Sequence, residues 1–182
     1  MAALRSAEIR TAHTASLSAA DLRAVRELLD EAFGGDFSDE DYEHGLGGMH
    51  ALVWDAATLI AHGSVIMRRL LHSGRTLRTG YVESVAVHPD HRGQGHGNAV
   101  MTTLEAIISG GYEIGALSSS EDGLAFYASR GWRLWRGTAS VLSPGGIVRS
   151  PEDDGAIFVL PGSAQLQSDG ELACDWREGD PW

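Results

Sequence analysis

A glycine-rich turn lies between a strand-like run and a helix-like run in the middle of the chain. The turn is Val87–Gly97, VHPDHRGQGHG, and residues 81–87 before it alternate and are rich in branched side chains, as strands are. Apolar residues, Val100 and Leu104 among them, then recur at helical spacing. Strand, turn and helix in this order point main-chain N–H groups and the positive end of a helix dipole at one spot. Because glycines leave that spot open, the pattern predicts a cradle for a diphosphate.

The spacing within the turn argues against two common nucleotide loops. A dinucleotide fingerprint is Gly-x-Gly-x-x-Gly with an acidic residue about twenty positions later. Here the order is Arg92-x-x-Gly95-x-Gly97. A Walker loop requires a Gly-Lys pair, and the chain contains no lysine.

The Arg92–Gly97 motif resembles the acetyl-CoA loop of the GCN5-related N-acetyltransferase (GNAT) superfamily. A second segment, Phe126–Trp132 (FYASRGW), resembles the superfamily's helix end with a tyrosine, followed by glycine and an aromatic residue. Many relatives have asparagine seven residues before that tyrosine, whereas this chain has Ser120, which can still cap the helix. The resemblance implies an α/β (α+β) fold, a single GNAT-like acyl-CoA N-acyltransferase domain over residues 1–182 with a central mixed β-sheet flanked by helices.

The same resemblance implies acetyl-CoA as cosubstrate. The pantetheine arm would pair with the strand before the turn as an added strand, and the diphosphate would bind the main chain of the turn. The expected cofactor-binding residues are Val85, Ala86, Val87, Arg92, Gly93, Gln94, Gly95, His96 and Gly97.

Composition narrows the other possibilities. A net charge of −11 argues against a nucleic-acid partner and favours a cationic one. No stretch is long and apolar enough to span a membrane, and the amino terminus lacks a signal-peptide pattern, so a cytoplasmic protein is expected. The one cysteine, Cys174, is expected to be an apolar filler, and the scattered histidines predict no metal site.

Over nearly its whole length the chain also resembles aminoglycoside 2′-N-acetyltransferases. The resemblance is carried by Gly34–Phe37, Leu46–Leu52, Gly80–Glu83, Gly115–Ser120, Asp153–Gly155, Phe158–Pro161 and the ending Cys174–Trp182. It implies a cationic aminoglycoside as acceptor and a homodimer as the assembly. It also implies an acceptor site lined by Asp36, Glu83, Ser84, Ser118, Glu152, Asp153, Asp180 and the terminal carboxylate of Trp182.

The distribution of acidic residues agrees with such an acceptor. An aminoglycoside is a polycation covered in hydroxyls, so its site needs carboxylates and neutral hydrogen-bonding groups. Residues 36–43 contain five acids and no base, and residues 152–182 contain eight acids and one arginine. A solvated acidic face is the alternative interpretation of both clusters, and a frayed chain end is the alternative for Asp180 and Trp182.

The expected chemistry is direct attack of an amine on a thioester. By resemblance, Glu83 is the base that deprotonates the amine through a water, although a role in binding the cationic acceptor alone stays open. An N–H near Val85 would stabilise the oxyanion. Tyr127 resembles the superfamily's general acid for the departing thiolate, and positioning of the sulfur is its alternative role.

Two other functions stay open. The chain could bind acetyl-CoA and an effector without turnover, although Glu83, Tyr127 and an intact glycine turn disfavour this. As an enzyme it could instead acetylate a polyamine, a peptide amine or a cell-wall amine.

The expected order of elements follows from periodicity, caps and breakers. Helices are predicted from Ser18 to about Phe33, from Ser38 to before Gly45, after the glycine turn, and near residues 122–129. Strands are predicted at residues 7–13, 50–54, 59–69, 77–87, 112–117, 132–136 and 156–160, with loops at residues 144–146 and at Pro151.

Overall fold

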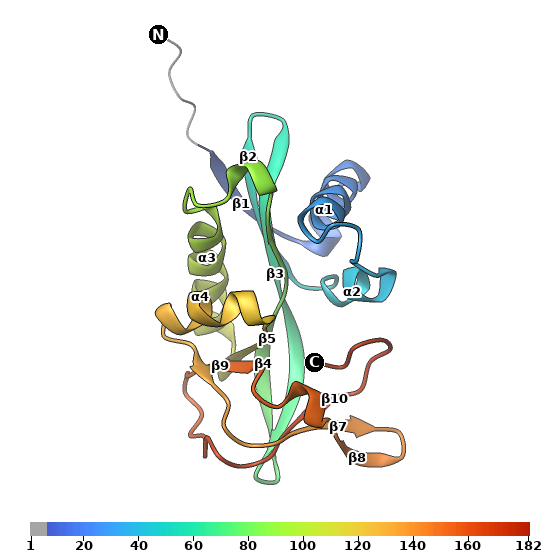
Figure 1. Ribbon diagram of the computed structural model, residues 1–182, viewed down its shortest axis with the longest axis vertical. Coiled ribbons are helices and arrows are strands. Elements are labelled where there is room, and N and C mark those ends of the chain that lie inside the picture. Colours follow the sequence, from blue (N-terminus) through green and yellow to red (C-terminus); the bar gives the residue numbers. More distant parts are fainter. Residues whose placement is uncertain (1–6) are drawn as a thin grey trace. The chain divides into compact units, whose positions relative to one another are not determined.

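The computed structural model describes residues 7–182. Its contacts divide the chain into two compact units, and the two longest strands, β3 (Thr58–His72) and β4 (Arg75–Val87), contribute residues to both (Figure 1). Of the described residues, unit 1 comprises 7–66 and Val82–Ala106, and unit 2 comprises Met67–Tyr81 and Ile107–Trp182.

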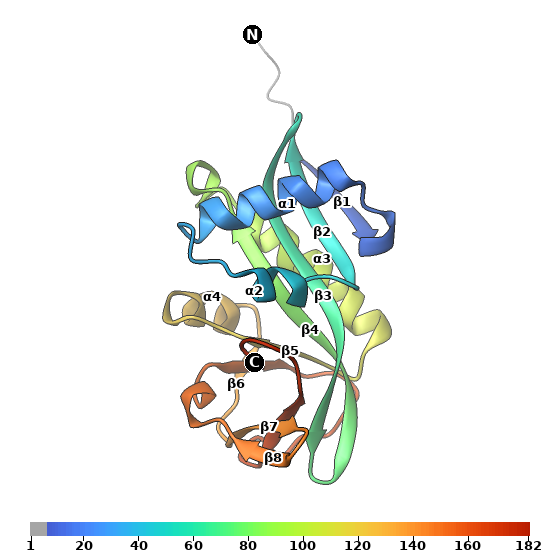
Figure 2. The same ribbon diagram turned by 90° about the vertical axis from the view of Figure 1, so that its right-hand side faces the viewer.

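Unit 1 is a small sheet with helices on both faces (Figure 2). Strand β1 (Glu8–His13) pairs antiparallel with β2 (Met49–Asp55), which pairs antiparallel with the first part of β3. One face carries α1 (Ala19–Ala32) and α2 (Asp39–His44), and the other carries α3 (His96–Gly111).

The two helices before β2 begin and end where the sequence predicts. Ser18 and Asp21 form a reciprocal capping box at the start of α1, and Ser38 and Asp41 form another at the start of α2. After α1, Gly34–Gly35 adopt positive φ values of 67° and 87°, which end the helix. The apolar face of α1 packs on β2 and β3, and this core comprises Val25, Leu28, Leu29, Leu52, Leu59 and Ala86.

Unit 2 contains strands β5–β10 and parts of β3 and β4. The strand order in the sheet is β6-β9-β5-β4-β3-β10-β7-β8. Their bounds are β5 (Ile114–Ser118), β6 (Arg133–Leu134), β7 (Ala139–Ser143), β8 (Gly146–Arg149), β9 (Ile157–Leu160) and β10 (Leu172–Asp175), and the unit's short helix is α4 (Leu124–Ser129). Single 3₁₀ turns occur at Thr14–Ser16, Pro89–His91, Glu121–Gly123 and Pro151–Asp153. Strands β4 and β5 run parallel and pair from Thr79–Tyr81 to Ile114–Ala116.

The expected mixed sheet with flanking helices is confirmed, because parallel and antiparallel pairs occur together. Strands β7, β8 and β10 were not predicted. Of the predicted loop Pro144–Gly146, the first two residues form the turn of the β7–β8 hairpin, and Gly146 belongs to β8, where it pairs with Ser143. Within residues 7–182, no helix is both long and apolar enough to cross a membrane.

Candidate functional site

The glycine turn has the geometry that the sequence predicts. Strand β4 ends at Val87 and α3 begins at His96, with Gly95 O accepting the first helical bond, from Ala99 N, at 3.0 Å. Gly93 and Gly95 have φ values of 73° and 88°, a conformation that other residues adopt only with strain. The first N–H groups of a helix have no partner within the helix, so α3 offers donors to an anion at this turn.

The side chain of Arg92 is engaged within unit 1. Its Nη2 donates to the main-chain oxygen of Ala32 at 3.0 Å, and its Nε donates to that of Val87 at 3.3 Å. Arg92 therefore ties the glycine turn to the C-terminal end of α1. Any contact with a bound diphosphate would come in addition to this role.

Strand β4 turns sharply at Ser84, which has a φ of 55°. Its hydroxyl is buried without a hydrogen-bond partner among residues 7–182, and a Cβ added to Gly45 would lie 2.7 Å from it. On the other side of the sheet, a Cβ on Gly63 would lie 3.2 Å from the Val85 side chain. The half-buried Glu83 precedes this turn, and its main-chain oxygen accepts a bond from Ser64 Oγ at 3.5 Å.

Tyr127 lies on α4 among aromatic rings. Its centroid is 5.2 Å from that of Phe126, 5.9 Å from Phe158 and 6.2 Å from Trp132. Burial raises the pKa of Tyr127 to about 12, so the phenol stays protonated at neutral pH and can donate a hydrogen bond. Ser120, four residues before α4, makes no capping bond through its side chain, which differs from the expectation.

Asp153 is buried, with 9% of the residue exposed. The hydroxyl of Ser150 donates to its Oδ2 and also lies 3.2 Å from Glu152 Oε1. Burial raises the pKa of Asp153, and the negative charges of Asp180 and Glu152 act in the same direction. A cation beside Asp153 would favour its charged form.

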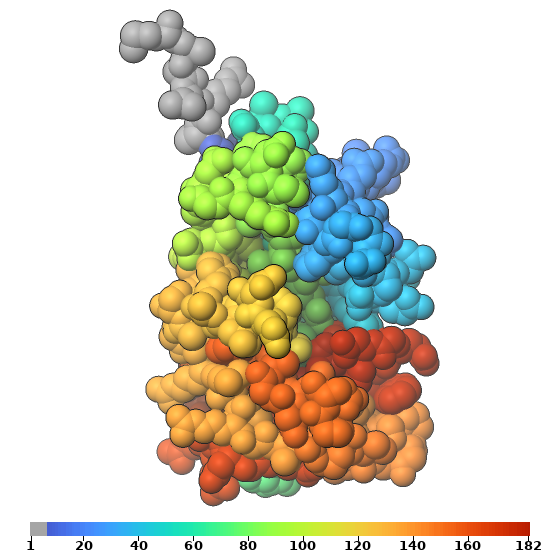
Figure 3. Space-filling view, viewed as in Figure 1, coloured from blue at the N-terminus to red at the C-terminus, as the bar shows by residue number. Residues whose placement is uncertain are grey.

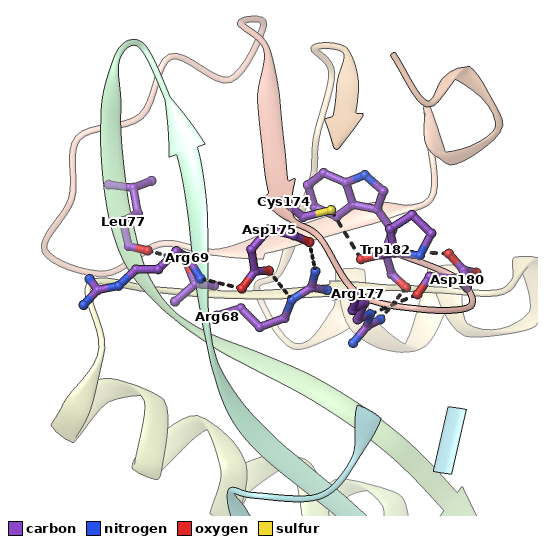
Figure 4. A network of polar contacts seen from close by, with 10 residues as sticks. Arg68, Arg69, Leu77, Cys174, Asp175, Arg177, Asp180 and Trp182 are labelled. Carbon is purple, nitrogen blue, oxygen red and sulfur yellow. Dashed lines mark hydrogen bonds and ion pairs between the residues drawn. The ribbon is translucent and has the colours of Figure 1, made fainter. Parts of the chain in front are cut away.

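The last residues pack into unit 2, so they do not fray. Figure 3 shows the dark red chain end lying against the orange segments of the same unit. Trp182 is 4% exposed and belongs to the core cluster that includes Cys174. Its main-chain N–H donates to Asp180 Oδ1 at 3.1 Å, and Arg177 donates to the main-chain oxygens of Asp180 and Trp182, each at 2.9 Å (Figure 4).

A second arginine fixes the strand that leads to this chain end. Arg68 Nε donates to Asp175 Oδ1 at 2.7 Å, and its Nη2 donates to the main-chain oxygen of Asp175 at 2.8 Å (Figure 4). The guanidinium carbons of Arg68 and Arg177 lie 4.6 and 5.6 Å from the centre of the Tyr81 ring. Strand β10 and the residues after it are therefore held by directional polar contacts.

The predicted site residues divide between the units. Unit 1 contains Asp36, Glu83, Ser84, Val85, Ala86, Val87 and the turn Arg92–Gly97, whereas unit 2 contains Ser118, Tyr127, Glu152, Asp153, Asp180 and Trp182. Asp36, in the turn after α1, and Ser118, at the end of β5, are exposed. Within residues 7–182, no group of three or more His, Cys, Asp or Glu side chains is placed to hold a metal ion.

Sequence reasoning missed the supporting residues Ser150, Arg177, His50 and His62. Ser150 bonds Asp153 three positions later, the spacing of a capping box, and this local signal could have indicated it. Arg177 bonds main-chain oxygens three and five positions later, for which no sequence pattern is typical. The histidines carried a weak signal, since His50 and His62 each interrupt an apolar strand run, as a buried polar residue would.

Comparisons with known proteins identify relatives of the chain. Residues 13–135 match the model of an acetyltransferase (GNAT) domain. The chain is similar to an aminoglycoside 2′-N-acetyltransferase of Mycolicibacterium fortuitum, at 49% identity over 177 residues that cover 95% of this chain and 91% of that protein.

Solved structures share the fold at low sequence identity. The GNAT family N-acetyltransferase YhbS of Escherichia coli, in complex with CoA, has a TM-score of 0.63 at 19% identity and covers 97% of this chain and 92% of its own. A GNAT family acetyltransferase of Brucella melitensis, in complex with acetyl-CoA, has a TM-score of 0.61 at 14% identity and covers 94% of this chain and 97% of its own.

Proposed function

Because the chain belongs to the GNAT family of acetyltransferases, we propose that it transfers the acetyl group of acetyl-CoA to the 2′-amino group of aminoglycosides. The observation that carries this proposal is the 49% identity, over 95% of the chain, to an enzyme named for that reaction. Such a modification removes a cationic amine from an antibiotic and would confer resistance. Acetyl-CoA as donor favours a cytoplasmic enzyme. A homodimer is also proposed, and it is consistent with the exposed apolar side chains of the β7–β8 hairpin, Leu142, Ile147 and Val148.

The proposed cofactor site is the edge of β4 and the glycine turn. Main-chain groups of Val85–Val87 pair with the pantetheine arm, and the N–H groups at the start of α3 receive the diphosphate. Local main-chain donors allow an anionic cofactor to bind a protein whose net charge is −11.

The proposed reaction is direct attack of the 2′ amine on the thioester carbon. Glu83 accepts a proton from the amine through a water, and the N–H of Val85 stabilises the oxyanion. The C–S bond then breaks, and Tyr127 donates a hydrogen bond to the departing thiolate. The acceptor is held by Asp36, Glu83, Ser84, Ser118, Glu152, Asp153, Asp180 and Trp182.

Regiochemistry tests the proposed acceptor. We expect tobramycin and gentamicin to be acetylated, and kanamycin A, which has a 2′ hydroxyl, to bind and to turn over poorly. Product NMR and mass spectrometry identify the modified amine. Acetylation at a 3 or 6′ amine would contradict the 2′ assignment without affecting the family assignment, and preference for a polyamine or a peptide amine would contradict the aminoglycoside itself.

A paired glycine substitution tests the cofactor site. Gly95→Val places a branched side chain in the proposed diphosphate position and should abolish acetyl-CoA binding in calorimetry. Because Gly95 has positive φ, the variant also costs roughly 1–2 kcal/mol of stability, which urea unfolding measures. Gly110→Ala, near the end of α3 with no atom within 4 Å of the added Cβ, should leave binding unchanged. Wild-type affinity in Gly95→Val would exclude the turn as the cofactor site.

A further inference from the structure

Two buried histidines of unit 1 form a series of contacts that runs from Thr14 to Ser84 on β4. His50 on β2 and His62 on β3 are each 1% exposed, and 2.9 Å separates His50 Nδ1 from His62 Nε2. At one end, His50 Nε2 lies 2.7 Å from Thr14 Oγ1. At the other end, His62 Nδ1 lies 2.9 Å from the main-chain oxygen of Ser84. We call this series of contacts the histidine relay.

With both imidazoles neutral, the contacts fix which ring nitrogen carries each proton. A carbonyl oxygen only accepts, so His62 Nδ1 must carry the proton that bonds to Ser84. His62 Nε2 is then an acceptor, which makes His50 Nδ1 the donor and leaves His50 Nε2 to accept from the Thr14 hydroxyl. The hydroxyl oxygen lies 2.7 Å from His50 Nε2 and 3.2 Å from its other acceptor, the main-chain oxygen of Gly48. Both rings are neutral in this arrangement. Burial, in agreement, lowers the pKa of His50 to about 4 and that of His62 to about 3.

The relay cannot carry a proton to the reacting groups. It ends on the carbonyl of Ser84, which has no proton to pass on, and neutral rings with low pKa values do not become charged at neutral pH. Its effect is therefore on geometry. Ser84 has a φ of 55°, and a non-glycine residue in this region is strained and persists only where its surroundings hold it.

Two features of unit 1 hold Ser84 in this conformation. His62 bonds its carbonyl, and Gly45 provides the space for its side chain, because a Cβ at Gly45 would lie 2.7 Å from Ser84 Oγ. Ser84 separates Glu83, the proposed base, from Val85, whose N–H is the proposed oxyanion donor. A change in the Ser84 torsions would therefore move these two groups relative to each other.

We propose that His50 and His62 are positioning residues for acetyl transfer, holding the left-handed turn at Ser84 so that Glu83 and Val85 meet the reacting atoms. The inference rests on the proposed function for its kinetic readout. Displacement of a catalytic group by about 1 Å can reduce the rate about 10²-fold, so a bond to the residue between Glu83 and Val85 is sufficient to control it.

Three variants test the relay by steady-state kinetics. His62→Leu removes the bond to Ser84 and should lower kcat by about 10²-fold, with KM for acetyl-CoA changed less than about threefold. His62→Asn puts an amide N–H where Nδ1 lies and should recover at least about tenfold of that loss. His72→Leu makes the same change at another buried histidine, which bonds main-chain groups of Glu171 and Gln167, and should keep the wild-type kcat.

Either of two kinetic results overturns the proposal: a kcat for His62→Leu within about threefold of wild type, or an equal loss in His72→Leu. NMR of the wild-type imidazoles provides a second test that needs neither a variant nor an acceptor. At neutral pH we expect His50 and His62 to be neutral with the proton on Nδ1. A proton on Nε2 of either ring, or a charged ring, refutes the relay. If the wild-type enzyme acetylates no aminoglycoside, the proposed function fails, and the NMR result still decides the relay.

Discussion

Arg92 donates from Nη2 to the main-chain oxygen of Ala32 at 3.0 Å, so the residue that opens the glycine turn also caps the end of α1. The last turn of α1 contains no basic residue, and a cation there interacts favourably with the helix dipole. Arg92→Met should lower the free energy of unfolding of the cofactor-free protein by about 1 kcal/mol in urea. Arg23→Met, an exposed arginine on α1, is the control and should change it by less than about 0.5 kcal/mol. Normal stability with weak acetyl-CoA binding would assign Arg92 to the cofactor alone.

Tyr127 should act as a hydrogen-bond donor without giving up its proton completely. Its pKa of about 12 exceeds the roughly 8.5 of an ordinary thiol, so full transfer to a thiolate is uphill. Tyr127→Phe should lower kcat about tenfold without changing acetyl-CoA affinity, whereas Tyr112→Phe, also a partly buried tyrosine, should have no effect. Because Tyr127 stays protonated, kcat should not fall between pH 7 and 10 on its account. A fall with an apparent pKa near 10 that disappears in Tyr127→Phe would contradict this.

Asp153→Asn should stabilise the protein and weaken acceptor binding. Burial and neighbouring carboxylates raise the pKa of Asp153, which means that folding disfavours its charged form. Asparagine removes that penalty at pH 7, and the gain in melting temperature should shrink as the pH falls and the wild-type carboxyl becomes protonated.

Losing the charge of Asp153 should raise the aminoglycoside KM about tenfold or more, with a smaller increase at high salt and no change in the KM for acetyl-CoA. Glu27→Gln, on the exposed face of α1, controls for net charge. Lower stability in Asp153→Asn would show that its bond from Ser150 outweighs the charge penalty.

Acidification should destabilise the protein through the two relay histidines. Burial lowers the pKa of His50 to about 4 and that of His62 to about 3, below the 6.5 expected in the unfolded chain. Between the folded and unfolded pKa values of each histidine, the unfolded state binds more protons than the folded state. The free energy of unfolding is therefore highest above about pH 7, and it falls with falling pH by roughly 1.4 kcal/mol per pH unit for each histidine. Denaturant unfolding of wild type and His62→Asn measures this, and the variant should have the shallower slope between pH 7 and 5. Equal slopes would mean that His62 does not titrate on unfolding.

Local signals predicted the parts of the fold that are determined locally. The capping boxes at Ser18 and Ser38 and the strand–turn–helix at Gly95 depend on neighbouring residues, and each is present. Strands β7, β8 and β10 are only four or five residues long, and β10 pairs with β7 and with residues 70–72 of β3. Strands this short leave little periodicity to detect, so they could not be predicted from pattern alone.

The candidate site shows the same limit. The sequence indicates the glycine turn and the acidic segments, because a motif and a run of charges can be recognised from the order of residues alone. It does not indicate that Ser84 adopts positive φ, or that His62 holds its carbonyl, since these depend on residues about 22 positions apart meeting across a sheet. The aromatic residues of the tail predict that it packs, and Trp182 does so, but the sequence does not indicate which core residues it contacts.

The burial of Cys174 has a practical consequence for measuring turnover. It is the only cysteine in the chain, it is fully buried, and burial raises the pKa of its thiol to about 11. The thiolate is the reactive form of cysteine, so Cys174 of the folded enzyme should not react with aromatic disulfide reagents. Colour developed during catalysis would therefore report released CoA with no protein background, and slow reaction of the enzyme alone would report its unfolding.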